Sequence, residues 1–211
     1  IVTGLVGSEM CIRDRPNWCS NSLVVEGPDK DVAAFKKAAA GSTQSYNNIR
    51  PMAKEWPVHD DIRLRAAVEE TPEPGEYSEL SFHALMPVPD RIRRFGYDSN
   101  QSQQLARALG ADAPMGGYEW EHTNWGVKWG ACEVAVDDSI PDKLIYDFDT
   151  AWAPPIEFFT KIAKKWTNLK FFLSYSEPGM AFEGEISIQG DKILSHEERE
   201  MKDEYEDEEH E

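Results

Sequence analysis

Short apolar segments in the first part of the chain predict a strand followed by a helix. The segment 21–27, NSLVVEG, has the composition of a strand and is closed by Gly-Pro. In 28–41 the apolar residues recur at helical spacing, and Gly41 stands where a helix would be capped. The residues on that apolar face are Val32, Phe35 and Ala39.

Beyond the predicted helix this regularity is lost. Prolines stand at positions 51, 57, 72 and 74, so we expect a long irregular insertion at about 42–78, with Trp56 packing back onto the body. The segment 79–89 then alternates apolar and polar residues, which predicts another strand with His83 on its polar face. The alternating apolar residues are Leu80, Phe82 and Ala84.

The second half of the chain contains most of the predicted regular structure. Helices are expected at 100–110, with an asparagine cap, and at 154–166, where prolines precede a clear apolar stripe. Strands are predicted at 131–137, 143–152, 169–179 and 180–190. The sequence DDSIPD joins the first two of these strands, and SEPG joins the last two.

This order of elements predicts an α+β protein with a mostly antiparallel sheet and helices packed on one face. A split βαβ, ferredoxin-like arrangement is the natural solution. We expect one domain over residues 16–190, interrupted by the insertion at about 42–78.

Charge is unevenly distributed along the 211 residues, whose formal net charge is −17. Residues 195–211 hold ten acidic residues against Arg199 and Lys202, a net of −8, so the other 194 residues carry −9. A run this polar predicts a disordered acidic tail, placed at 191–211. Direct binding to nucleic acid is disfavoured, because phosphate contacts need a basic surface.

The beginning of the chain differs in character from the rest. Residues 1–15 resemble translated sequencing-adapter read-through, so we interpret them as a non-native leader. The three cysteines have no CxxC spacing, which favours a reduced, cytoplasmic setting. No apolar run approaches the roughly 20 residues that a membrane span needs. No cofactor is indicated.

Four stretches carry a resemblance to the YubB ferredoxin-like domain family of phage and plasmid proteins. They are PNWCSNSLVVEG, NWGVKWGACEV, YDFDTAWAPPIEFF and LSYSEPGMAFEGE. The resemblance covers nearly all of residues 16–188. It implies a ferredoxin-like fold and an origin in a mobile genetic element, but it implies no mechanism and no catalytic residues.

Two tryptophans four residues apart, Trp125 and Trp129, form the first candidate site. In an extended segment they would point the same way, with Lys128 opposite and Trp152 at the end of the neighbouring strand. They could cover one end of the core. They could instead stack a nucleobase while Lys128 meets a phosphate, or form a hot spot for a protein partner.

Acidic residues in the second half of the chain form further candidates. Asp147 and Asp149 alternate on one strand face, where an Asp-x-Asp pair could hold a divalent cation, with ligands added by Glu183 and Glu185. Ordinary alternation on a half-exposed strand explains the same pattern. The pair Tyr175 and Glu177 could face a pocket, or could serve only the SEPG turn. Spacing does not favour zinc at the cysteines and at His83 and His122.

These features favour a non-enzymatic binding protein that interferes with host machinery or defence. It would bind either a small anionic, nucleotide-like ligand at the tryptophans or a basic host protein through its acidic surface. The alternatives are a metal-dependent phosphotransfer or nuclease enzyme that uses Asp147 and Asp149, and a structural or assembly component. Pairing of two copies into a homo-oligomer is compatible with an exposed sheet edge.

Overall fold

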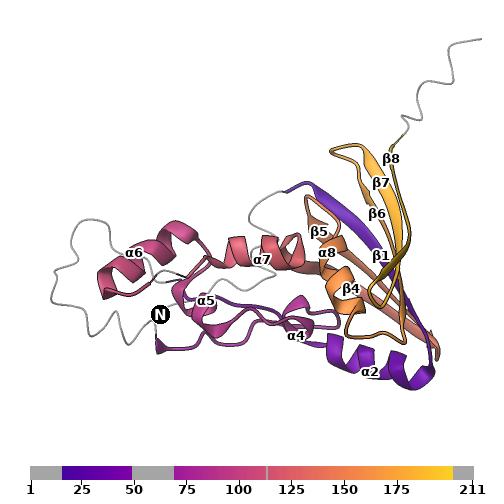
Figure 1. Ribbon diagram of the computed structural model, residues 1–211, viewed down its shortest axis with the longest axis horizontal. Helices are drawn as coiled ribbons and strands as arrows, with labels where there is room; N and C mark the ends of the chain where they lie inside the picture. The colour runs from indigo at the N-terminus through magenta and orange to yellow at the C-terminus, as the bar shows by residue number, and fades with distance from the viewer. Residues whose placement is uncertain (1–15, 49–68, 113, 202–211) are drawn as a thin grey trace, which may run out of the picture.

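Six antiparallel strands form the main sheet of the protein, in the order β4-β5-β1-β6-β7-β8 (Figure 1). The computed structural model describes residues 16–48, 69–112 and 114–201. The strands are β1 (Trp18–Glu26), β4 (Lys128–Ile140), β5 (Lys143–Ala151), β6 (Lys170–Glu177), β7 (Phe182–Gln189) and β8 (Lys192–Glu200).

The first four of these strands and two helices form a ferredoxin-like core. Helix α2 (Asp29–Ala39) follows β1, and α8 (Ile156–Ala163) lies between β5 and β6. Strand β5 separates β1 from β4, so the unit β1-α2-β4 is a split βαβ. Strands β7 and β8 extend the sheet beyond β6. The predicted α+β, ferredoxin-like fold is confirmed.

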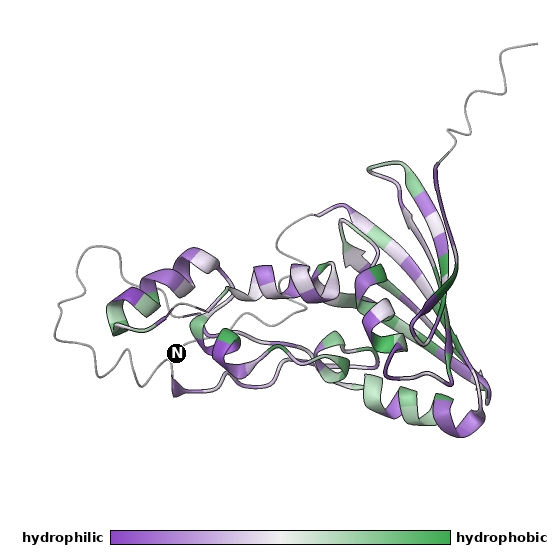
Figure 2. Cartoon of the chain, viewed as in Figure 1, coloured by the Kyte–Doolittle hydropathy of each residue, from purple (hydrophilic) through white to green (hydrophobic). Residues whose placement is uncertain are grey.

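Both core helices pack on one face of the sheet (Figure 1). The strands alternate between hydrophobic and hydrophilic residues, because successive side chains point to opposite faces (Figure 2). Rings from the helices and the sheet interlock: Phe35 of α2 meets Phe171 of β6 edge-to-face, with centroids 5.3 Å apart. Fully buried residues on this face include Leu23, Val25, Leu144, Phe159 and Ile162.

The chain leaves the core between α2 and β4, over a longer stretch than 42–78. The elements of this excursion are β2 (Gly41–Ser42), β3 (Tyr77–Ser78), α4 (Phe82–Leu85), α5 (Asp90–Phe95), α6 (Ser99–Leu109) and α7 (Gly117–Trp125). Strands β2 and β3 pair with each other, apart from the main sheet. Trp56 lies outside the described residues. None of the helices in the described ranges has the length and apolar character needed to cross a membrane.

Three local predictions in this region are wrong. Residues 79–89 contain α4 and no strand, because the hydroxyl of Ser81 caps a helix by accepting a hydrogen bond from the amide of Ala84. Helix α2 ends before an extended Ala40, and Gly41 begins β2 instead of capping the helix. The cap of α6 is Asp98, which accepts from the amide of Gln101, rather than an asparagine.

The acidic tail is also more ordered than expected, because 192–200 form strand β8 along the edge of β7. The ladder supplies backbone hydrogen bonds that composition alone does not reveal. Tyr175 adds a side-chain tie, since its hydroxyl donates to Glu198 at 3.0 Å. The prediction of disorder from 191 onward is therefore wrong for β8, and residues 202–211 lie outside the described residues.

Candidate functional site

The segment NWGVKW is not extended, so the expected same-face pairing of its tryptophans is wrong. Helix α7 ends at Trp125, and Gly126 caps it in the left-handed conformation, with φ of 76°. Trp125 is fully buried in the main core, edge-to-face with Phe82 and Phe158. It has the environment of a core anchor.

Trp129 lies in a separate small cluster. It is 4% exposed and packs with Ala151, with Trp18 and Tyr97 beside them. The ammonium of Lys128 sits 3.7 Å from the centroid of the Trp129 ring, within the range of a cation–π contact. The two indoles therefore occupy different clusters: Trp125 is enclosed in the core, and Trp129, although largely buried, contributes to the wall of a separate hollow beside β3.

The remaining candidates from the aromatic and turn motifs are also dispersed. Trp152 is 49% exposed, with φ of 73°, and its amide donates to the carbonyl of Asn17 at 2.9 Å. Glu177 is buried and accepts from the amides of Gly179 and Met180, so it stabilises the turn after β6. Tyr175 is buried as well and points toward β8. The structure does not bring these residues together with Trp129.

Asp147 and Asp149 do lie on one face of β5, as predicted, and it is the face turned away from the core residues Tyr146 and Phe148. Strand register extends this face across the sheet in two rows. One row runs Cys132, Asp149, Ser20, Ser176, Glu183, Arg199, and the next runs Ala135, Asp147, Ser22, Ser174, Glu185, Glu197. We call these twelve residues the open face.

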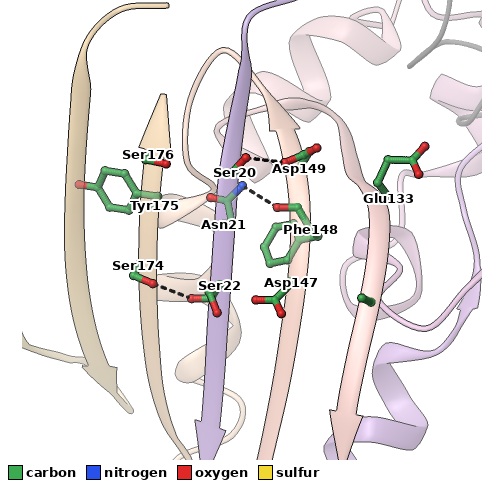
Figure 3. Close-up of a pocket in the computed structure, with 11 residues that line it drawn as sticks. Ser20, Asn21, Ser22, Glu133, Asp147, Phe148, Asp149, Ser174, Tyr175 and Ser176 are labelled. Atoms are coloured by element: carbon green, nitrogen blue, oxygen red, sulfur yellow. Dashed lines mark hydrogen bonds between the residues drawn. The ribbon is translucent and has the colours of Figure 1, made fainter. Parts of the chain in front are cut away.

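A hollow of about 510 Å³ lies over the centre of the open face (Figure 3). Its charged lining residues are Glu133, Asp147 and Asp149, and among the residues that the structure describes no lysine, arginine or histidine lines it. The hydroxyl of Ser20 donates to Asp149 at 2.9 Å, which orients that carboxylate. Serines supply much of the floor, and the carboxylates beside them give the hollow a negative charge.

Glu183 and Glu185 stand too far from Asp147 and Asp149 to add ligands to the expected cation site. Asp149 and Glu183 occupy strands separated by β1 and β6, and three strand spacings amount to roughly 14 Å. The part of the chain that the structure describes contains no group of three or more potential ligands placed to hold a metal ion. The arrangement suits several separate cationic groups better than one ion.

The environments of Cys19, Cys132 and His83 are typical of residues that serve the fold. Burial raises the pKa of the Cys19 thiol to about 12, and the nearby Glu177 carboxylate adds to the effect, so the thiolate is scarce at neutral pH. Cys132 of β4 is buried as well. Burial lowers the pKa of His83 to about 4, and its Nδ1 accepts from the amide of Val88 at 3.0 Å.

Sequence reasoning missed a buried acid on α7. Glu121 is fully buried and accepts hydrogen bonds from the Tyr46 hydroxyl at 2.6 Å and from the Trp129 amide at 2.7 Å. Gln44 donates to the Trp129 carbonyl at 2.7 Å. Burial raises the pKa of Glu121 to about 7, and the hydrogen bonds oppose that rise only in part. The residues involved are distant in sequence, so no local motif indicates this cluster.

The open sheet face and the two helices behind it define a ferredoxin-like domain with an added helical excursion. The family model described as "Ferredoxin-like domain in Api92-like protein" matches residues 124–211. The crystal structure of the protein api92 from Yersinia pseudotuberculosis is similar in fold, with a TM-score of 0.50 and 11% sequence identity. That likeness covers 89% of this chain and 99% of the api92 chain. No curated protein matches the sequence.

Proposed function

We propose that this protein is a non-enzymatic binding protein of a phage or related mobile element, and that its open face receives a basic surface of a host protein. The observation that carries the proposal is the hollow on the open face, whose charged lining residues in the described part of the chain are Glu133, Asp147 and Asp149, without a basic residue. The YubB-like sequence stretches support the mobile-element origin.

Charge complementarity selects the partner. The rows place carboxylates on β5 and again on β7 and β8, with serines of β1 and β6 between them. Arg199 of β8 pairs with Glu183 at 2.7 Å, so the excess of negative charge is greatest over β5. A basic protein surface presents lysine or arginine groups over a comparable width, and serine hydroxyls can accept or donate hydrogen bonds between them. The facing potentials would speed association and favour basic partners over acidic ones.

A nucleotide-like ligand fits this surface less well. Its phosphates would meet carboxylates in the hollow, and like charges brought together are unfavourable. The indole expected to stack a base, at Trp129, is buried. Interference with host machinery is therefore proposed to act through a protein contact, with occlusion of a basic host surface as its effect.

Binding of a labelled deca-arginine peptide to the full chain, measured by fluorescence anisotropy, tests the proposal. We expect affinity to fall steeply between about 50 mM and about 300 mM salt, because salt screens exposed charges. The double variant Asp147→Asn/Asp149→Asn should bind on the order of tenfold more weakly, since two attractive charges are lost.

The matched control is Asp142→Asn/Asp191→Asn, which removes two exposed charges from hairpin turns away from the hollow. It should weaken binding by less than about twofold. Equal weakening by both double variants would mean that net charge, rather than the open face, attracts the peptide. Thermal stabilisation by nucleotides but not by the peptide would also contradict the proposal.

A further inference from the structure

The Glu121 cluster joins three parts of the chain that are remote from one another. Glu121 lies on α7, Tyr46 and Gln44 follow β2, and Trp129 stands near the beginning of β4. The two oxygens of one carboxyl bind both the Tyr46 hydroxyl and the Trp129 amide. The cluster thus fastens the segment 43–47 to the edge of the main sheet.

The backbone of Trp129 has an energetically unfavourable conformation. Its φ of 72° lies in the left-handed region, which bulky residues rarely adopt. Its indole nitrogen is buried and has no hydrogen-bond partner within the described residues. Such a conformation persists only when surrounding contacts impose it. Here the contacts are Glu121 at the Trp129 amide and Gln44 at its carbonyl.

Charged groups from other elements also lie near the cluster. Arg93 of α5 binds the carbonyl and hydroxyl of Ser45, and Lys128 lies over the Trp129 ring. On its own helix Glu121 is flanked by Glu119 and His122. The Glu121 carboxyl accepts hydrogen bonds from the Tyr46 hydroxyl and the Trp129 amide, and the Gln44 side chain also contributes; all three are uncharged donors.

We propose that Glu121, Tyr46 and Trp129 form a proton-linked latch, closed when Glu121 is protonated and opened by its ionisation. Opening would expose the carboxylate to water, release the Trp129 amide, and free the segment 43–47 from β4. The same strand carries Glu133 of the hollow, so opening would reach the open face. The latch needs no ligand, and its test is therefore independent of the proposed function.

Proton linkage determines whether a rise in pH favours the open or the closed latch. Burial raises the pKa of Glu121 to about 7 from an ordinary value of 4.5, whereas an opened, hydrated carboxyl returns to that ordinary value. Opening therefore releases a proton and becomes more favourable as pH rises. Between about pH 5 and pH 8 the opening equilibrium should increase on the order of a hundredfold.

Hydrogen exchange of the Trp129 amide and of residues 43–47, corrected for the intrinsic effect of pH, measures this opening. We expect protection to fall with rising pH in the unmodified protein and to be independent of pH in Glu121→Gln, which resembles the protonated acid. Glu133→Gln, at an exposed position on β4, is the control and should retain the pH dependence.

Tyr46→Phe supplies a second test that does not depend on the folding of Glu121→Gln. The Tyr46 hydrogen bond lowers the pKa of Glu121, so its removal should move the midpoint of opening to higher pH. A purely structural role for Tyr46 would reduce protection without moving the midpoint. Corrected exchange that does not vary with pH in the unmodified protein, or a midpoint unmoved by Tyr46→Phe, would overturn the latch.

Discussion

Along β1 and β6, neighbouring residues point to surfaces of opposite chemistry. Toward the helices lie Leu23, Val25, Phe171 and Leu173. Toward the open face lie Ser20, Ser22, Ser174 and Ser176. The first set is buried among aromatic rings, and the second forms the floor of a charged hollow. The strands thus separate the residues that fold the protein from those available to bind a partner.

Substitutions on the two faces of the sheet should therefore have different effects. Truncating a residue on the helix side leaves a cavity in a packed core, whereas replacing a polar side chain on the open face changes little but charge. Stability and binding should therefore respond to different sets of residues. The four changes below test that difference, beginning with the largest expected effect on stability.

Trp125→Ala should reduce the free energy of unfolding by about 3–5 kcal/mol, because a fully buried indole is removed from the core. Urea denaturation followed by circular dichroism measures the loss. Binding of the deca-arginine peptide to the remaining folded protein should be unchanged. A loss below about 1 kcal/mol would indicate that Trp125 is not a core anchor.

Ionisation of buried Glu121 should lower the stability of the unmodified protein as pH rises from about 4.5 to about 7, because the pKa of Glu121 is raised from 4.5 to about 7 on folding. The stabilisation is fully present below the lower value and is lost through the upper one. The shift corresponds to about 3 kcal/mol. Half-buried His83, whose pKa is lowered to about 4, raises stability over much of the same range, so the Glu121 contribution is the difference between the unmodified protein and Glu121→Gln. Urea unfolding across this range measures the loss, and Glu121→Gln should lack this component of the slope. An unchanged slope in that variant would assign the pH dependence to other groups.

Gly184→Ala should reduce stability by about 1–3 kcal/mol and loosen β8. A Cβ at this position would lie 2.5 Å from the Tyr175 hydroxyl and 2.6 Å from the Glu197 carbonyl, so Tyr175 could no longer pass over β7 to Glu198. Hydrogen exchange should increase in β8 before it increases in β1. Exposed Ser195→Ala, on the same edge strand, is the control and should leave exchange in β8 nearly unchanged.

Asp147→Asn/Asp149→Asn should change the free energy of unfolding by less than about 0.5 kcal/mol, although it weakens peptide binding. Both side chains lie on the open face, and the removal of two like charges offsets the lost hydrogen bond from Ser20. Chemical denaturation of the variant beside the unmodified protein decides the point. A large destabilisation would mean that the open face also serves the fold.

The local pattern of apolar and polar residues was sufficient to predict much of the fold. Alternation placed Asp147 and Asp149 opposite Tyr146 and Phe148, and helical spacing located α2 and α8. It failed at residues 79–89, where alternating Leu80 and Phe82 precede a capped turn of helix, and at Trp125, where Gly126 ends one element before the next begins. In both places a backbone cap decided the structure.

The candidate site depended on relations that a single segment does not contain. The open face required the register of six strands, and the Glu121 cluster required contacts between α7, the segment after β2 and the edge of β4. The strand at 192–200 also formed in a highly charged sequence, because β7 offered a ladder for it. The composition of a segment alone does not show that a neighbouring strand, here β7, can order it.

Strand β8 has a consequence for assembly, since it forms an exposed edge of the main sheet. Unprotected edges invite end-on growth into aggregates, and proteins commonly prevent it with charged side chains. If two β8 edges joined, Glu197, Glu198 and Glu200 of one copy would be brought close to the same acidic cluster of the other. We therefore expect the acidity of this strand to oppose edge-to-edge self-association of the sheet.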